Sequence, residues 1–81
     1  MPRVSGKSDK DKLLVQLGAA IRARRYVLGL SQEALADHAG IDRSHMGKIE
    51  RGERNVTLLN LAKLADALSC LTSDLLLEAG L

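Results

Sequence analysis

Residues 30–52 read LSQEALADHAGIDRSHMGKIERG, and this stretch predicts two short helices joined by a tight turn. Ser31 is a favourable N-cap for a helix over residues 32–39, and Gly40 is a typical residue to end it. Asp42 is in turn a favourable N-cap for a helix over residues 43–51. Because only Gly40, Ile41 and Asp42 separate the two helices, they must meet at a sharp angle, as in a helix-turn-helix.

The second of these helices has a polar face of a kind that suits DNA. At about 100° per residue, one stripe about 140° wide holds five of its residues, while Met46 and Ile49 point the other way, toward a core. The stripe contains Arg43, Ser44, Gly47, Lys48 and Arg51. Arg and Lys donate to guanine O6 and N7, and Ser serves several bases. A glycine inside a helix costs about 1 kcal/mol relative to alanine, so Gly47 suggests a close approach of the backbone to the groove. An ordinary solvated face with a tolerated glycine is the alternative.

The remaining chain predicts three more helices and no strands. Apolar residues recur at helical spacing over residues 13–28 and 58–68, and a short leucine-rich segment covers residues 74–79, with Thr72 or Ser73 as its cap. The fold class is therefore all-α, a compact domain of five helices over residues 13–81. Residues 1–12 are polar and are expected to form a flexible N-terminal arm.

Composition limits the possible functions. The chain has 81 residues and a single cysteine, Cys70, which excludes an internal disulfide and a cysteine-based zinc site. Positive charge lies toward the front of the chain, with seven basic and two acidic residues among the first 25. This distribution is expected for a surface that meets a polyanion, although a basic tail on a solubilising surface gives the same count.

No signal peptide or membrane span is apparent, so a cytoplasmic, nucleoid-associated protein is expected. We find no nucleophile–base pair, paired carboxylates, phosphate loop or metal cluster, and therefore expect no enzyme activity, no cofactor and no small-molecule substrate.

The segment from "LSQEALA" through Gly40 and "IERG" to "RN" resembles the Cro and lambda-repressor-like (XRE) helix-turn-helix family, over about residues 13–78. The pattern "DRSHMGKIERGERNVTLLNL" is most similar to the controller proteins of restriction-modification systems. The resemblance implies a sequence-specific regulator of transcription that binds double-stranded DNA. An antitoxin that binds a toxin and represses its own operon is the alternative.

The resemblance also implies roles for individual residues. Bases would be contacted by Arg43, Ser44 and Lys48, with Gly47 close to the groove, and phosphates by Gln32, Arg54 and Asn55; Arg51 shares the basic face and is assigned to the phosphates. Arg25 and Glu50 occupy the places of a partly buried ion pair that joins the first helix to the third. His45 packs at the core rim or reaches the DNA backbone.

The last helix has more leucines than one small core requires. This surplus predicts a surface for a second copy of the chain, so that a homodimer would bind a palindromic operator. The residues assigned to the dimer interface are Leu71, Leu75, Leu76, Leu77 and Leu81. The alternative is that these leucines close the core of the monomer.

Overall fold

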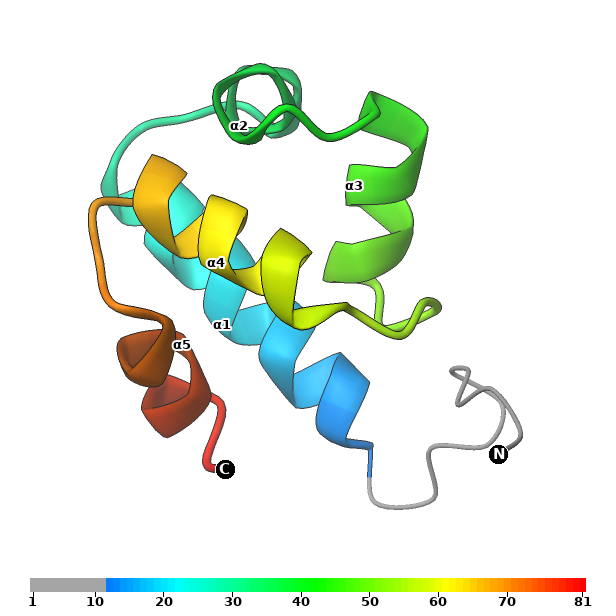
Figure 1. Ribbon diagram of the computed structural model, residues 1–81, viewed down its shortest axis with the longest axis vertical. Coiled ribbons are helices and arrows are strands. Elements are labelled where there is room, and N and C mark those ends of the chain that lie inside the picture. Colours follow the sequence, from blue (N-terminus) through cyan, green and yellow to red (C-terminus); the bar gives the residue numbers. More distant parts are fainter. Residues whose placement is uncertain (1–11) are drawn as a thin grey trace.

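The computed structural model describes residues 12–81, and these residues form five helices and no strand (Figure 1). The predicted all-α architecture is confirmed, and the predicted helix ends agree with the observed ones to within about two residues. The helices are α1 (Leu13–Val27), α2 (Gln32–Ala39), α3 (Arg43–Glu50), α4 (Leu58–Ala67) and α5 (Thr72–Glu78). Of the predicted arm, only Lys12 lies within the described residues.

The turn between α2 and α3 is built from the capping residues that the sequence indicates. The Ser31 hydroxyl accepts a hydrogen bond from the Ala34 N–H at 3.0 Å, and an Asp42 carboxylate oxygen accepts one from the Ser44 N–H at 3.1 Å. Gly40 ends α2 with a φ of +68°, in the left-handed region that glycine adopts without strain. These local contacts fix where α3 begins relative to α2.

The start of α5 differs from the prediction. The N-cap is Leu71 rather than Thr72 or Ser73, because the Asp74 carboxylate accepts a hydrogen bond from the Leu71 N–H at 2.9 Å. This reach back to the cap residue satisfies an N–H that the helix itself leaves without a partner. The helix consequently includes Thr72 and Ser73 in its first turn.

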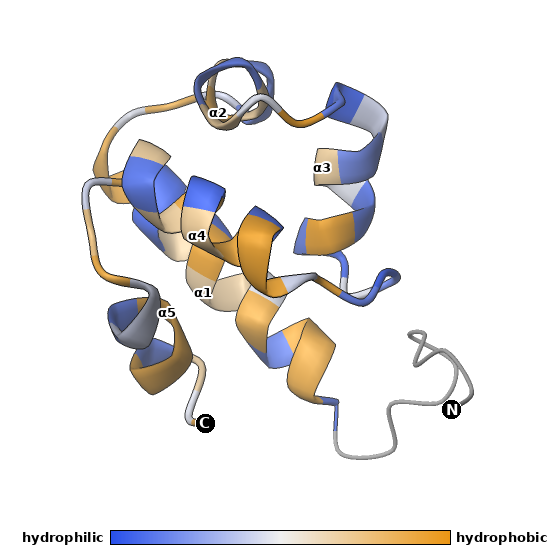
Figure 2. Ribbon diagram, viewed as in Figure 1, coloured by the Kyte–Doolittle hydropathy of each residue, from blue (hydrophilic) through white to orange (hydrophobic). Residues whose placement is uncertain are grey.

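A single aliphatic core lies between the helices, with α1 packed against α3 and α5, α2 against α3 and α4, and α4 against α5. Figure 2 shows the hydrophobic residues concentrated on α1, α4 and α5, whereas much of α3 is hydrophilic. The largest fully buried side chains are Ile21, Leu35, Met46, Ile49, Leu64, Leu68 and Leu75. No helix within residues 12–81 combines the length and the apolar character that crossing a bilayer requires.

The C-terminal end of α3 lies directly against α1. A Cβ atom added to Gly18 of α1 would collide with the carbonyl oxygens of Ile49 and Glu50. A Cβ on Gly52, which follows α3, would lie 2.7 Å from the Cα of Val15. These two glycines therefore allow the end of α3 to contact the backbone of α1 and fix its position on the core.

Candidate nucleic-acid interface

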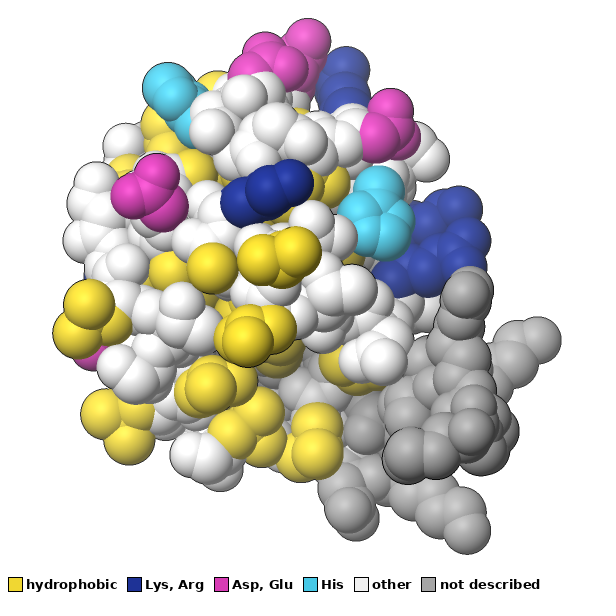
Figure 3. All heavy atoms as spheres, in the orientation of Figure 1, with side chains coloured by type: hydrophobic (Ala, Val, Ile, Leu, Met, Phe, Trp, Pro, Cys, Tyr) yellow, Lys and Arg dark blue, Asp and Glu magenta, His cyan; other side chains and the backbone are white. Residues whose placement is uncertain are grey.

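The polar side chains of α3 form one surface, as the helical spacing predicts. We call Arg43, Ser44, Gly47, Lys48 and Arg51 the recognition stripe. A single hollow on the protein surface is lined by all five, together with Gln32 and Asp42. Arg43 and Ser44 are exposed, and Lys48 is half-buried. Basic side chains gather at the α3 edge of the molecule in Figure 3.

Two cations of the stripe are paired with acidic neighbours. The Arg43 guanidinium lies 3.5 Å from a Glu33 carboxylate oxygen, and the Arg51 Nε lies 2.7 Å from one of Glu53. The hydrogen bond from Arg51 also lowers the pKa of Glu53. All four side chains are more than half exposed, so these pairs are weak and a stronger anion can displace the carboxylates.

Gly47 is covered by side chains of this same chain, which changes the interpretation of the sequence. A Cβ added there would lie 3.0 Å from Arg51 Nη1 and 3.4 Å from Gln32 Oε1. Gly47 is therefore buried in the free protein, and its close approach to the DNA groove stays a prediction. The missing side chain leaves room for the Arg51 guanidinium, whereas Gln32 Oε1 lies at ordinary van der Waals distance from a Cβ at this position.

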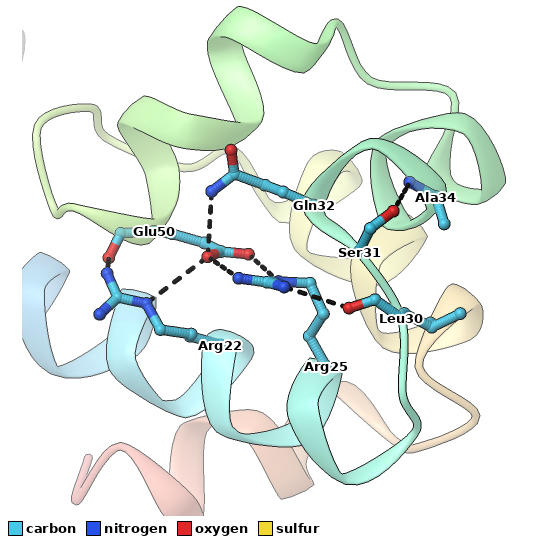
Figure 4. A network of polar contacts seen from close by, with 7 residues as sticks. All are labelled: Arg22, Arg25, Leu30, Ser31, Gln32, Ala34 and Glu50. Carbon is cyan, nitrogen blue, oxygen red and sulfur yellow. Dashed lines mark hydrogen bonds and ion pairs between the residues drawn. The ribbon is translucent and has the colours of Figure 1, made fainter.

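Gln32 reaches this position because its amide is held by a buried carboxylate. Its Nε2 donates a hydrogen bond to Glu50 Oε1 at 3.2 Å (Figure 4). The side-chain N–H₂ group that was expected to meet a phosphate is thus engaged inside the protein. In the first turn of α2, the Ala34 N–H is bonded to the Ser31 hydroxyl, and the N–H groups of Gln32 and Glu33 lie outside the helical hydrogen-bond ladder.

Arg25 and Glu50 form the ion pair that the resemblance implies. Arg25 Nε donates to Glu50 Oε2 at 2.8 Å and Arg25 Nη2 to Glu50 Oε1 at 2.9 Å, while Arg25 Nη1 donates to the Leu30 carbonyl oxygen at 3.1 Å. The Glu50 side chain has no exposed surface and that of Arg25 is 9% exposed. A bidentate pair of this kind fixes the orientation of both helices more than it adds stability.

Arg22 also belongs to the network around Glu50, and sequence reasoning missed it. Its Nε lies 3.6 Å from Glu50 Oε1, and its Nη2 donates to the Glu50 carbonyl oxygen at 3.4 Å. Burial alone raises the pKa of Glu50, but hydrogen bonds from Arg25 and Gln32 and the charges of Arg25 and Arg22 outweigh it, so the pKa is lowered. Glu50 is therefore ionised at neutral pH. The spacing of Arg22 and Arg25 on one helix face was the available signal.

The other residues predicted to contact phosphates lie in the loop after α3. Arg54 and Asn55 are both exposed there, just beyond Gly52.

His45 is half-buried on α3, and His38 is exposed on α2. Within residues 12–81, no group of His, Cys, Asp and Glu side chains is arranged to hold a metal ion.

The leucines assigned to a dimer interface do not all lie on the surface. Leu71, Leu77 and Leu81 are 68%, 75% and 49% exposed, and Leu76 is half-buried against the core. Leu75 is fully buried, and its assignment to the interface is wrong, because residues 75–77 point about 100° apart and Leu75 is the one that the core encloses completely. Figure 3 shows hydrophobic side chains over α4 and α5 on the face that it presents.

An ion pair that the sequence did not indicate joins α5 to α1. Arg24 Nη2 donates to Glu78 Oε1 at 2.7 Å, and Arg24 Nε donates to Glu78 Oε2 at 2.9 Å. These residues are 54 positions apart, so no local pattern suggests the contact. The pair fixes the side of α5 that faces α1.

Comparison with known proteins places this geometry in a family. Residues 21–75 match the helix-turn-helix family model. The chain belongs to this family. Its relatives include control protein C.SmaI of Serratia marcescens, 45% identical over 65 residues, which covers 80% of this chain and 77% of that protein.

Solved structures of helix-turn-helix proteins have the same arrangement of helices. The restriction-modification controller protein C.AhdI from Aeromonas hydrophila is 50% identical with a TM-score of 0.75, over 76% of this chain and 94% of that one. The clp gene regulator ClgR from Corynebacterium glutamicum is 32% identical with a TM-score of 0.81, over 84% of this chain and 72% of that one. The similarity therefore extends to controller proteins and to another gene regulator.

Proposed function

We propose that this helix-turn-helix protein is a sequence-specific regulator of transcription that binds double-stranded DNA, of the restriction-modification controller type. The observation that carries the proposal is the recognition stripe, which presents Arg43, Ser44 and Lys48 together along α3. A helix of this size enters the major groove, where Arg and Lys donate to guanine. The similarity to C.SmaI and C.AhdI supports the controller type.

Affinity and selectivity would come from different residues. Arg51, Arg54 and Asn55, with the backbone N–H groups at the start of α2, would bind phosphates and supply a salt-dependent affinity that is the same for every sequence. Arg43 and Lys48 would read base edges. Because the stripe is fixed to α1 through Glu50 and Gly18, its side chains approach the DNA from a constant direction.

A second copy of the chain would complete the regulator. Leu71, Leu77 and Leu81 present exposed apolar surface around α5, and Leu76 lies at its edge. Apolar surface gathered on one side of a small domain is typical of a partner interface. A twofold dimer would place two copies of α3 about 34 Å apart on one side of a palindromic site.

The proposal is tested by comparing Arg43→Ala with Arg54→Ala. Duplexes bound by the wild-type chain are first selected from random DNA, and affinities for a selected and a random duplex are then measured over a range of salt concentrations. Arg43→Ala is expected to lose about 1–3 kcal/mol on the selected duplex and to relax one base position. Arg54→Ala is expected to weaken binding to both duplexes alike and to reduce the salt slope by about one.

Lys63→Ala is the control, because it removes an exposed positive charge of α4 that lies outside the recognition stripe. It should bind both duplexes nearly as the wild type does. Failure of the wild-type chain to select any duplex would contradict the proposed function. Equal losses on selected and random DNA for Arg43→Ala would contradict the assignment of base reading to the stripe.

A further inference from the structure

Gln32 belongs to α2, yet its amide lies in the middle of the recognition stripe of α3. Its Oε1 lies 3.4 Å from the position that a Cβ of Gly47 would occupy. The hollow along the stripe is lined by Gln32 as well as by the α3 side chains. The end of the Gln32 side chain thus lies at van der Waals distance from the place where a side chain of residue 47 would begin.

The orientation of this amide is determined by its buried partner. Glu50 is ionised and accepts hydrogen bonds from Arg25 and from Gln32 Nε2, at 2.9 Å and 3.2 Å on the same oxygen. A carboxylate has no hydrogen to donate, so a flipped amide would bring two acceptor oxygens together. The N–H₂ group must therefore face Glu50, and Oε1 is turned away from Glu50 toward α3 (Figure 4).

We infer that Gln32 is a specificity-determining residue whose Oε1 accepts a hydrogen bond from an exocyclic amino group of a base in the major groove. This inference rests on the proposed function and deepens it. An outward-facing acceptor is repelled by a phosphate oxygen, which is also an acceptor. The amino groups that the major groove offers to an acceptor are N6 of adenine and N4 of cytosine.

Glu50 acts on this contact as a positioning residue. It holds the amide so that the amide oxygen points away from the buried carboxylate. The backbone N–H groups at the start of α2 stay available to a phosphate, so one residue contributes its main chain to affinity and its side chain to selectivity.

The test removes one amino group from the DNA and one amide from the protein. A duplex selected by the wild-type chain is synthesised in versions that each replace one adenine or cytosine by an analogue without its exocyclic amino group. Affinities are measured for the wild type and for Gln32→Ala. At one position of the half-site the wild type should lose about three- to tenfold, as for one hydrogen bond, and Gln32→Ala should lose nothing further there. The effect of the analogue on base pairing is common to both proteins and cancels in this comparison.

Two further variants keep the result interpretable. Gln16→Ala changes the same residue type on α1, beside Ala19 and Ala23 and away from the stripe, and should respond to every analogue as the wild type does. Gln32→Asn keeps an amide that is one methylene shorter, so it retains polarity at the position but cannot reach over Gly47. It should lose the amino-group effect in the same way, and it tests the contact if Gln32→Ala does not fold.

Three outcomes are distinguished. Loss of the amino-group effect in Gln32→Ala or Gln32→Asn at one position supports the inference. The inference is overturned if the Gln32 variants lose equal affinity for selected and random duplexes and every analogue affects the wild type and the variants alike. That result assigns the Gln32 side chain to a phosphate. Absence of any selected duplex for the wild-type chain contradicts the proposed function itself.

Discussion

At the scale of single residues, Glu50 determines the polar interior of the domain. One carboxylate without exposed surface accepts hydrogen bonds from Arg25 and Gln32 and lies beside Arg22. These three partners come from α1 and α2, whereas Glu50 ends α3. The residue therefore joins the three helices that position the recognition stripe.

Replacing Glu50 by alanine should destabilise the fold strongly. Glu50→Ala leaves the buried Arg25 guanidinium without its carboxylate, and removal of one partner from a buried pair costs about 3–5 kcal/mol. Urea denaturation followed by circular dichroism measures the change. Glu53→Ala removes an exposed carboxylate whose partner Arg51 stays in water, and should change stability little. Equal stability of wild type and Glu50→Ala would show that the pair contributes nothing to the fold.

The same carboxylate gives the domain a dependence on acid. The pKa of Glu50 is lower in the folded protein than its unfolded value of about 4.3, so the unfolded chain binds the additional proton as pH falls. Its contribution is complete above about pH 4.3 and is lost as pH falls further toward the folded pKa. Denaturation of wild type and Glu50→Gln at a series of pH values should give stability curves that converge on acidification. A constant difference between the two curves below pH 4.3 would argue against a lowered pKa.

At the scale of the helices, most boundaries follow from local chemistry and were predictable. Ser31 and Asp42 each cap the helix that the sequence assigned to them, because a cap needs only residues within three positions. Contacts between distant segments were not predictable in the same way. The close approach at Gly18 depends on how α3 crosses α1, and the acceptor for the Gln32 amide lies 18 residues away.

The leucines of α5 illustrate the same limit. A run of three leucines over residues 75–77 has no polar contrast from which the buried face can be identified. Only the packing of α5 against α1 and α4 selects Leu75 for the core. The surplus of apolar surface was therefore predictable, whereas its exact membership was not.

Gly47→Ala is expected to separate stability from DNA binding. Alanine favours the helix by about 1 kcal/mol, and the atoms that its Cβ would approach, Arg51 Nη1 at 3.0 Å and Gln32 Oε1 at 3.4 Å, end flexible side chains that can shift. Thermal denaturation should thus show an unchanged or raised melting temperature. Affinity for a selected duplex should fall because the displaced Arg51 side chain belongs to the proposed interface. A melting temperature well below that of the wild type would show that Arg51 cannot move aside.

At the scale of the whole molecule, the two proposed surfaces use different helices. The recognition stripe lies on α3, and the exposed leucines Leu71, Leu77 and Leu81 lie in and around α5. α1 packs against both of these helices. The association of two copies and the binding of DNA can therefore be altered separately.

Leu77→Asp should yield a monomer. Leu77 is 75% exposed, so aspartate there does not disturb the core, but it places a charge within the proposed apolar interface. Sedimentation velocity should show a dimer for the wild type and a monomer for the variant, with weaker binding to a palindromic duplex. Tyr26→Asp, at an exposed residue of α1 away from the hydrophobic side chains over α4 and α5, is the control and should remain dimeric. A monomeric wild type at high micromolar concentration would contradict the dimer.

Two consecutive arginines of α1 bear on the distance between the two half-sites of the proposed operator. Arg25 is joined to the end of α3, and Arg24, the next residue, is joined to Glu78 of α5. The recognition stripe and the proposed surface for the second copy are thus both joined to α1, at adjacent residues. A twofold assembly built this way has little freedom to stretch when a base pair, about 3.4 Å long, is inserted at the centre of symmetry. In the proposed dimer, the geometry of α1 therefore sets the distance between the two half-sites.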